Sequence, residues 1–406
     1  MGMMTLLTAG YGYYSEKLRR KKFVFLLLTV LLTLLYLSGF AVWSSYLYEK
    51  LRQMDSFLRF CPFGMAFFTV QGVRFLWETF RGRCRAVPGI TDTAEYLLFY
   101  PRLVMGPVQS YEQHTAMRRA AVLSSENLGS GLGRFVLGLA KKVLLADTIG
   151  LVYSGLYRPE FGDTSVLMTW VMLLAFALQL YFTVTGYADM AKGIARCYGF
   201  RLPESYGYPV LSGSLVTFGE QWNQSIVKWC RGCFAPMLHV QSWQFVPATI
   251  AAWMLVGCWY RPGVQMLLWG VWMGLWIALD AYLKNRLQRK IPVFFEVAAF
   301  ILVTFCGWAV FSSPTPADGI HRLGLLFGSS GSFLQDRDFY FLRSGAMILL
   351  IALYSASGHF SEMLRNTKKI PVLSRLCTIL TVPVQAVLLI LSLAVLTTQQ
   401  AASVLL

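Results

Sequence analysis

Residues 166–193 read VLMTWVMLLAFALQLYFTVTGYADMAKG, and this stretch shows most clearly what kind of fold the chain adopts. An apolar run from residue 166 to 187 is long enough for a helix to cross a bilayer, which takes about 20 residues. The second half of the quoted stretch, residues 179–193, contains Gln179, Tyr187 and Asp189. Polar and ionisable groups are costly at membrane depth and normally face one another or a water-filled cavity. The stretch therefore predicts a membrane-spanning helix whose end lines a polar interior.

The composition extends this prediction to the whole chain. Of the 406 residues, 56% are hydrophobic and only 14% are charged, whereas about 25% of a soluble domain is charged. We expect an all-α polytopic membrane protein with about eight full transmembrane helices, plus re-entrant and interfacial helices around a central polar tunnel. The eight spans are expected at residues 23–43, 61–77, 166–187, 245–259, 264–282, 292–311, 340–355 and 380–396. A single domain, 1–406, is expected, with a short N-terminal part (1–60), a core (61–311) and C-terminal helices (312–406).

Three further segments do not read as simple spans. Residues 94–108 carry Pro101 and Pro107 and favour a broken or re-entrant segment, which is tolerated only where protein or water surrounds it. Residues 132–157 contain charges and predict an interfacial or bent helix. Residues 211–229 place large apolar side chains at steps of three and four and predict one amphipathic helix.

The basic residues lie in clusters beside the apolar runs, and the formal net charge is +16. These clusters are at residues 17–22, 81–85, 284–290 and 365–375. Short basic loops of this kind are typical of the cytoplasmic side of a membrane protein. The charge therefore points to the lipid bilayer as the partner and argues against nucleic acid.

The cysteines and glycines carry no recognisable site. The eight Cys are scattered, and the one CxxC, at Cys230 and Cys233, has no second ligand pair for a zinc site. No metal is expected, and the cysteines read as packing residues. The glycine-rich stretch at residues 129–133 follows no strand and so does not read as a dinucleotide fingerprint.

Polar residues gather between residues 179 and 261, between strongly apolar flanks. A polar tunnel through the membrane core is one interpretation. A second interpretation makes residues 196–208 a plain cytoplasmic loop. Asp189 and Lys192 can also form a simple ion pair across one turn of a helix. Of the four histidines, His239 lies closest to this polar region.

Several stretches together resemble one family. The longest is QLYFTVTGYADMAKGIARCYGFRLPESYGYPVLSGS at residues 179–214. In the same order come PFGMAFFTVQGVRFLWETFRG (62–82), FYPRLVMGPV (99–108), GLAKKVLLAD (138–147) and FGEQWNQSIVKWCRGCFAPM (218–237). They resemble the membrane-bound O-acyltransferases, in particular the bacterial branch that O-acetylates alginate and other polysaccharides and passes D-alanine toward teichoic acids. The resemblance covers most of the chain from about residue 61 onward.

The resemblance implies a multi-pass protein of the bacterial inner or plasma membrane with a tunnel through it. An acyl donor, such as acetyl-CoA or an acyl carrier protein, enters from the cytoplasmic side as a co-substrate, and no cofactor is bound. The acceptor hydroxyl belongs to an extracytoplasmic polysaccharide or to a partner acyltransferase or esterase. The residues that the resemblance places along the tunnel are Gln179, Tyr187, Asp189, Trp222, Arg231, Trp259, Arg261 and His239.

The chain departs from the family at its histidines. Tyr260 in GCWYR (257–261) stands where the family has a histidine, Met273 meets a second one, and Asn223 meets a third. Tyr260 and Asn223 are therefore the candidate catalytic residues. Acyl transfer to a hydroxyl is helped by a base with a pKa near neutrality, whereas tyrosine has an ordinary pKa of about 10.

Three functions follow from these residues. The first is an O-acyltransferase with a remodelled centre. The second is a catalytically degenerate homologue that binds, exports or assembles components of an envelope-polysaccharide system. The third is an unrelated transporter, which the order of the motifs disfavours.

Overall fold

The computed structural model describes residues 1–51, 64–84, 89–156, 164–240, 242–285, 292–367 and 369–405, and the regular structure in those ranges is helical. The first helices are α1 Gly2–Tyr13, α2 Ser15–Arg19, α3 Lys22–Leu51, α4 Met65–Phe80, α5 Ile90–Leu98, α6 Tyr100–Met105, α7 Tyr111–Arg119 and α8 Ser125–Ala140. A π-helical segment, Lys141–Asp147, then leads into α9 Thr148–Leu156 and α10 Val166–Cys197. The remaining helices are α11 Leu215–Gln221, α12 Gln224–Cys233, α13 Phe245–Tyr260, α14 Val264–Asn285, α15 Val293–Ser312, α16 Pro316–Leu326, α17 Asp336–Ala356, α18 His359–Thr367 and α19 Pro371–Leu405. Some of the predicted segments and basic clusters extend beyond the described residues. The parts that lie outside are residues 61–63, 85, 157, 286–290 and 368.

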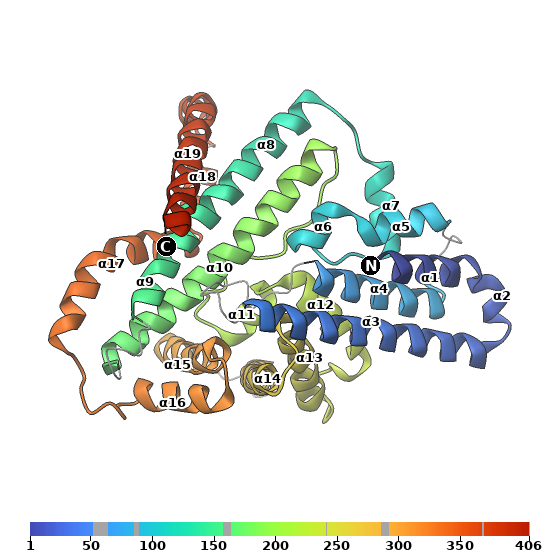
Figure 1. The fold of residues 1–406 in the computed structure, drawn as a ribbon, viewed down its shortest axis with the longest axis horizontal. Coiled ribbons are helices and arrows are strands. Elements are labelled where there is room, and N and C mark those ends of the chain that lie inside the picture. Colours follow the sequence, from blue (N-terminus) through green and yellow to red (C-terminus); the bar gives the residue numbers. More distant parts are fainter. Residues whose placement is uncertain are drawn as a thin grey trace. The chain divides into compact units, whose positions relative to one another are not determined.

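The chain forms two compact units. The first comprises Met1–Leu132, Ala191–Pro203 and Trp259–Pro262, and the second comprises Gly133–Met190, Glu204–Cys258 and Gly263–Leu406. In the first unit α3 and α4 lie side by side (Figure 1). Gly72 of α4 allows this approach, because a Cβ atom there would lie 2.2 Å from the ring of Tyr36 on α3. The expected division at residues 60 and 311 stays a prediction.

Five helices in the described part of the chain are long and apolar enough to cross a membrane. They lie at Lys22–Ser45, Val166–Cys197, Val264–Asn285, Val293–Ser312 and Ser374–Thr398. A sixth span arises if the bent pair Gly345–Ala356 and Ser361–Thr367, with 48° between its parts, counts as one. The helices α4 and α13 each have 16 residues, or about 24 Å of helix, which is shorter than the hydrocarbon core of about 30 Å. The fold is therefore an all-α membrane protein, and the count of eight spans stays a prediction.

The structure tests the three segments that sequence analysis did not predict as simple membrane spans. The break expected in residues 94–108 is confirmed, because α5 ends at Leu98 and α6 begins at Tyr100, with Pro101 in its first turn. The segment 132–157 contains the π-helical interruption at Lys141–Asp147. The single amphipathic helix expected at residues 211–229 is wrong. Trp222 has extended backbone angles and Asn223 is left-handed, so the segment divides into α11 and α12.

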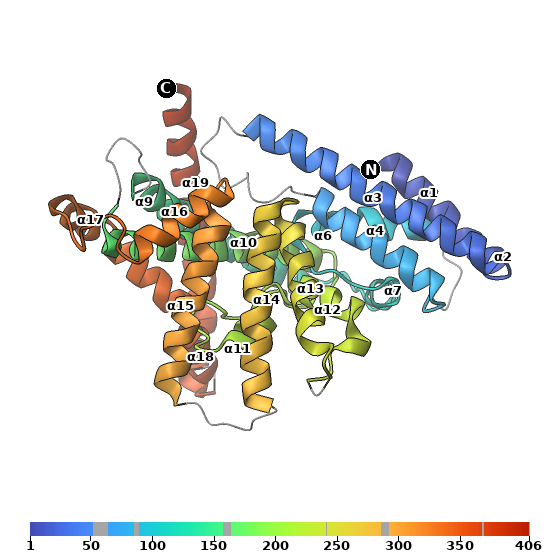
Figure 2. The same cartoon turned by 90° about the horizontal axis from the view of Figure 1, so that it is seen from below.

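Within the second unit, two close packings support the polar residues. The helices α8 and α10 run side by side (Figure 1), and a Cβ atom on Gly138 would lie 2.6 Å from the Gly186 carbonyl oxygen. Figure 2 shows α13, α14 and α15 side by side. The rings of Phe218 and Trp222 stack with their centroids 5.4 Å apart, and Trp308 of α15 lies 5.3 Å from Trp222. This aromatic core fixes the junction of α11 and α12.

Candidate functional site

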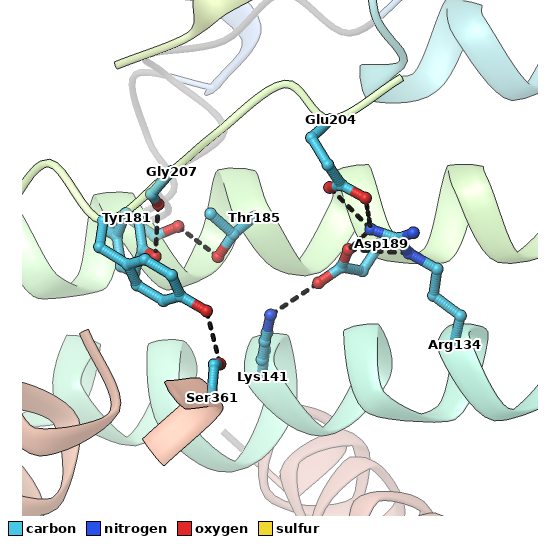
Figure 3. A network of polar contacts seen from close by, with 9 residues as sticks. Arg134, Lys141, Tyr181, Thr185, Asp189, Glu204, Gly207 and Ser361 are labelled. Atoms are coloured by element: carbon cyan, nitrogen blue, oxygen red, sulfur yellow. Dashed lines mark hydrogen bonds and ion pairs between the residues drawn. The ribbon is translucent and has the colours of Figure 1, made fainter. Parts of the chain in front are cut away.

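The polar end of α10 is the centre of an ion-pair cluster in the second unit (Figure 3). Asp189 lies within the continuous helix and accepts from Arg134 Nη2 of α8 at 2.9 Å and from Lys141 Nζ at 2.6 Å. Arg134 also donates to both carboxylate oxygens of Glu204, at 2.6 and 2.8 Å. Two cations thus balance two carboxylates. Burial lowers the pKa of Arg134, but the carboxylates of Asp189 and Glu204 outweigh it and raise that pKa.

The backbone segment that follows Glu204 is fastened to the same helix. Tyr181 Oη donates to the Gly207 carbonyl at 2.9 Å (Figure 3). The hydroxyls of Tyr208 and Ser361 of α18 are also hydrogen-bonded to each other. The Gly207 amide donates to the Gln221 carbonyl at 3.0 Å. The end of α11 is therefore held by the same segment that carries Glu204.

The junction of α11 and α12 is the most unusual backbone site in the second unit. Asn223 has φ 39° and ψ 56°, the left-handed region that a non-glycine residue rarely adopts. Its side chain is 1% exposed, and that of Trp222 is 0% exposed. Among the described residues, Trp222 Nε1 and Asn223 Nδ2 have no hydrogen-bond partner, and the same holds for the hydroxyls of Ser205 and Ser225.

Buried polar atoms are normally satisfied, and backbone strain of this kind persists where the surrounding structure imposes it. Both features are typical of functional sites. They occur together at the position where sequence analysis predicted a catalytic residue. This junction is the strongest candidate site in the described structure.

Tyr260 ends α13 and belongs to the first unit, where its side chain is 1% exposed. The ring of Trp259 packs edge-on against Phe67, with centroids 5.0 Å apart, and against Tyr260, at 4.8 Å. In the part of the chain that the structure describes, the buried Trp259 Nε1 lacks a hydrogen-bond partner. The phenol is therefore held in a tightly packed aromatic environment, and Arg261 next to it is partly buried.

The remaining predicted tunnel residues have varied surroundings. Gln179 is partly buried on α10 and packs on Gly150 of α9. Tyr187 lies under the Lys142 ammonium, 5.9 Å from the ring centroid. Arg231 is exposed on α12, as is His239 after that helix. A role in lining a tunnel stays a prediction for all of these residues.

Sequence reasoning missed the partners of Asp189. Sequence analysis named Lys192, one turn away, as a residue that can pair with Asp189. It did not name Arg134 and Lys141, which are 55 and 48 residues away in sequence. No local spacing predicts such a contact. The signal that was available was the basic pair in GLAKKVLLAD, which the resemblance included but did not place.

Comparison with known proteins agrees with these observations. Residues 78–232 match the model of the membrane-bound O-acyltransferase family. A probable alginate O-acetylase of Pseudomonas syringae is 28% identical over 282 residues, which are 67% of this chain and 52% of the relative. A peptidoglycan O-acetyltransferase of Helicobacter pylori is 23% identical over 309 residues, covering 66% of this chain and 57% of the relative. A teichoic acid D-alanyltransferase of Bacillus subtilis is 23% identical over 222 residues, covering 52% and 56%.

The chain spans about half the length of the curated relatives it matches. The matched region, residues 78–232, contains both the Asp189 cluster and the Asn223 junction. Tyr260 and His239 lie beyond it. This multi-pass membrane protein therefore carries a domain of the membrane-bound O-acyltransferase family, with relatives in its alginate, peptidoglycan and teichoic acid branch.

Proposed function

We propose that this protein is an O-acyltransferase. It transfers an acyl group, which we take to be acetyl, from a cytoplasmic donor such as acetyl-CoA or an acyl carrier protein. The acceptor is a hydroxyl on an envelope polysaccharide or on its extracytoplasmic carrier protein. The family domain and the activities named for the relatives support the class of reaction. The observation that carries the proposal is the buried, left-handed Asn223, whose amide nitrogen has no hydrogen-bond partner in the described part of the chain.

The Asn223 junction supplies what the transfer of an acyl group needs. The carbonyl oxygen of the acyl group gains negative charge when the hydroxyl attacks, and fixed N–H donors stabilise that charge. Trp222 Nε1 and Asn223 Nδ2 are such donors, held in place by the aromatic core of the second unit. Loss of one donor of this kind typically lowers the rate by about 10²–10³-fold.

Tyr260 has a different role in the proposal. A phenol is a hydrogen-bond donor at neutral pH and a poor general base, because its ordinary pKa is about 10. Tyr260 therefore orients or polarises a reactant. The exposed His239 is the remaining candidate base that the sequence offers. Turnover without a well-placed base is expected to be about 10²–10⁴-fold slower than with one.

The proposal includes the path of the substrates. A tunnel lined by the polar end of α10 leads the donor from the cytoplasmic side to the acceptor. About eight spans, two of them formed by the shorter helices α4 and α13, surround this tunnel. The extracytoplasmic end receives the polysaccharide or a partner acyltransferase or esterase. No bound cofactor is required, because the acyl donor itself is activated.

A second candidate function is a degenerate homologue that serves as a binding, export or assembly component. It is favoured by the three positions where, by the resemblance, a family histidine is replaced by a residue that is a poor base near neutrality: Tyr260, Met273 and Asn223. Tyr260 and Met273 are both 1% exposed, and Met273 is apolar.

The test measures transfer of labelled acetyl from acetyl-CoA in membranes that contain the protein. Label is followed into polymer, protein and free acetate, with membranes lacking the protein as the reference. The variants are Asn223→Ala, Tyr260→Phe and Tyr260→His, and Tyr100→Phe is the control because that tyrosine is 62% exposed. We expect transfer above the reference, reduced about 10²-fold in Asn223→Ala, lowered in Tyr260→Phe and unchanged in Tyr100→Phe.

Two results together would favour the second candidate. A folded preparation transfers no acetyl with either acetyl-CoA or an acetylated carrier protein as donor, and the Tyr260→His variant is inactive as well. If transfer is unchanged in the variants of both Asn223 and Tyr260, the reaction depends on other residues.

A further inference from the structure

A charged cluster lies where α14 ends and α15 begins, away from the residues assigned above. It consists of Asp280 and Lys284 on α14, Glu296 on α15, and Ser214 before α11. Asp280 is 9% exposed near the end of a largely apolar helix, and ionisable groups in such helices are costly and usually functional. Lys284 forms ion pairs with Glu296 and with Asp280, the latter at 3.2 Å.

Asp280 is directed at the beginning of α11. Its Oδ2 accepts from the Val216 amide at 3.0 Å and from Ser214 Oγ at 3.3 Å. Ser214 Oγ in turn accepts from Lys284 Nζ at 2.8 Å and from the Thr217 amide at 3.5 Å. The first amides of a helix have no partner within the helix, so the side chains of Asp280 and Ser214 together satisfy the N-terminus of α11.

The helix α11 depends on such support. It has seven residues, Leu215–Gln221, and an isolated helix of that length is unstable in water. Its middle is held by close packing, because a Cβ atom on Gly219 would lie 3.3 Å from Ile277 Cδ1, one turn before Asp280 on α14. Its other end, about 10 Å along the helix axis, leads directly into Trp222 and Asn223.

We propose that Asp280 is a positioning residue that anchors the N-terminus of α11 and so holds Trp222 and Asn223 in their strained conformation. Ser214 completes the anchor, whereas Lys284 and Glu296 form an ion pair beside it and, among the described contacts, make none with the first amides of α11. The catalytic part of this inference rests on the proposed function. The structural part, the anchoring of α11, does not.

The test combines amide hydrogen exchange over residues 215–223 with acetyl transfer, using the full-length protein in detergent or nanodiscs. Asp280→Ala removes the acceptor of the Val216 amide, and exchange in α11 should accelerate about tenfold, as for the loss of a helix cap. The kcat for transfer should fall about 10²-fold, the effect of a misplacement of about 1 Å, while the KM for acetyl-CoA changes little. Asp280→Asn keeps an accepting oxygen and should restore both readouts.

Glu296→Gln is the matched control, because it removes a charge from the same cluster without touching α11. Both readouts should stay near those of the unaltered protein. If Asp280→Ala does not fold, Ser214→Ala removes the other half of the anchor and should show the same faster exchange.

Unchanged exchange in α11 after removal of Asp280 or Ser214 would overturn the proposal. Equal effects of Glu296→Gln and Asp280→Ala would also overturn it, because the cluster would then stabilise α14 and α15 in general. If the unaltered protein transfers no acetyl, the proposed function fails, and hydrogen exchange alone still decides whether Asp280 anchors α11.

Discussion

Asn223 combines two properties that can be separated by substitution. Its backbone needs a left-handed conformation, and its side chain places an amide nitrogen that has no partner among the described residues. Glycine adopts this conformation freely, whereas alanine is strained in it. Replacement by each residue therefore distinguishes the backbone requirement from the chemical one.

The first prediction concerns these two variants. The free energy of unfolding of Asn223→Gly should lie within about 1 kcal/mol of that of the unaltered protein, because the backbone conformation is preserved and a buried unsatisfied group is removed. Its acetyl transfer should nevertheless fall about 10²-fold. Asn223→Ala should lose activity and also about 1–2 kcal/mol of stability. Thermal unfolding and labelled transfer check both, and full activity in Asn223→Gly would show that the amide has no chemical role.

A second residue, His114 of α7, is buried in the first unit and is predicted to make stability depend on pH. Its Nδ1 accepts from Arg102 Nη2 at 2.9 Å, which requires a neutral ring on that side. Burial, and then the charges of Arg102 and Arg118, lower the pKa of His114 to about 3. Glu95 Oε1, 3.5 Å from Nε2, is the one carboxylate that the described contacts place against the ring.

The sign of the effect follows from that lowered pKa. The unfolded chain takes up a proton at His114 below about pH 6.5, whereas the folded chain does not until about pH 3. This contribution to stability is therefore complete above pH 6.5 and declines as the pH falls toward 3. Melting temperatures between pH 7.5 and 4.5 should show a weaker decline in His114→Gln than in a control, His359→Gln, whose histidine is exposed. If the melting temperature falls equally with pH in both variants, His114 does not cause the pH dependence of stability.

At the scale of elements, the contact between α8 and α10 holds the Asp189 cluster together. Gly138 and Gly186 let the two backbones approach, since each added Cβ atom would come within 3 Å of the other residue's carbonyl oxygen. Small residues at such crossings are the usual means by which membrane helices pack closely. Arg134 and Lys141 reach Asp189 from α8 and the π-helical segment only because of this approach.

Gly138→Val should therefore separate the helices. We expect the free energy of unfolding to fall by about 1–3 kcal/mol, as for overpacking in a core, and acetyl transfer to fall with it. Gly129→Val, also on α8 but with nothing within 4 Å of its added Cβ, is the control. Thermal unfolding in detergent measures both, and equal stability of the two variants would contradict the close packing.

The elements also show what the sequence could predict. The long apolar helices α3, α10, α14, α15 and α19 were expected, because continuous hydropathy over about 20 residues is a strong signal. The break before α6 was readable from Pro101. The break at Asn223 could not be predicted from the sequence, because asparagine tolerates both helical and left-handed conformations. The aromatic packing around Trp222 selects the left-handed one. The helix α16 was missed, although Thr315 and Asp318 form a capping box at its start.

For the candidate site, the sequence supplied positions but not partners. Asn223 and Tyr260 were identified by resemblance alone. The ion pairs of Asp189 and the anchor at Asp280 join residues 48 to 66 positions apart, which no local pattern reveals. Lys284 was expected in a basic cytoplasmic cluster, and its ion pairs with Asp280 and Glu296 depend on the packing of α14 against α15.

At the scale of the whole molecule, the outward faces of the apolar helices are consistent with a lipid environment. Of the most apolar window of α19, 6% is buried within the chain, and the corresponding fraction for α10 is 67%. Exposed apolar surface of that extent indicates a lipid or protein contact. Among the five candidate spans of the described residues, α10, which carries Gln179, Tyr187 and Asp189, is thus the one with the largest buried share.

The measurement that tests the central claim most directly is the content of alkali-labile acyl esters in the envelope polysaccharide of cells. Cells that lack this protein are compared with the same cells carrying the unaltered protein, Asn223→Gly or Tyr100→Phe at equal membrane levels. The account predicts that esters disappear without the protein, return with the unaltered protein and with Tyr100→Phe, and do not return with Asn223→Gly. An ester content that is the same with and without the protein, or full restoration by Asn223→Gly, would contradict it.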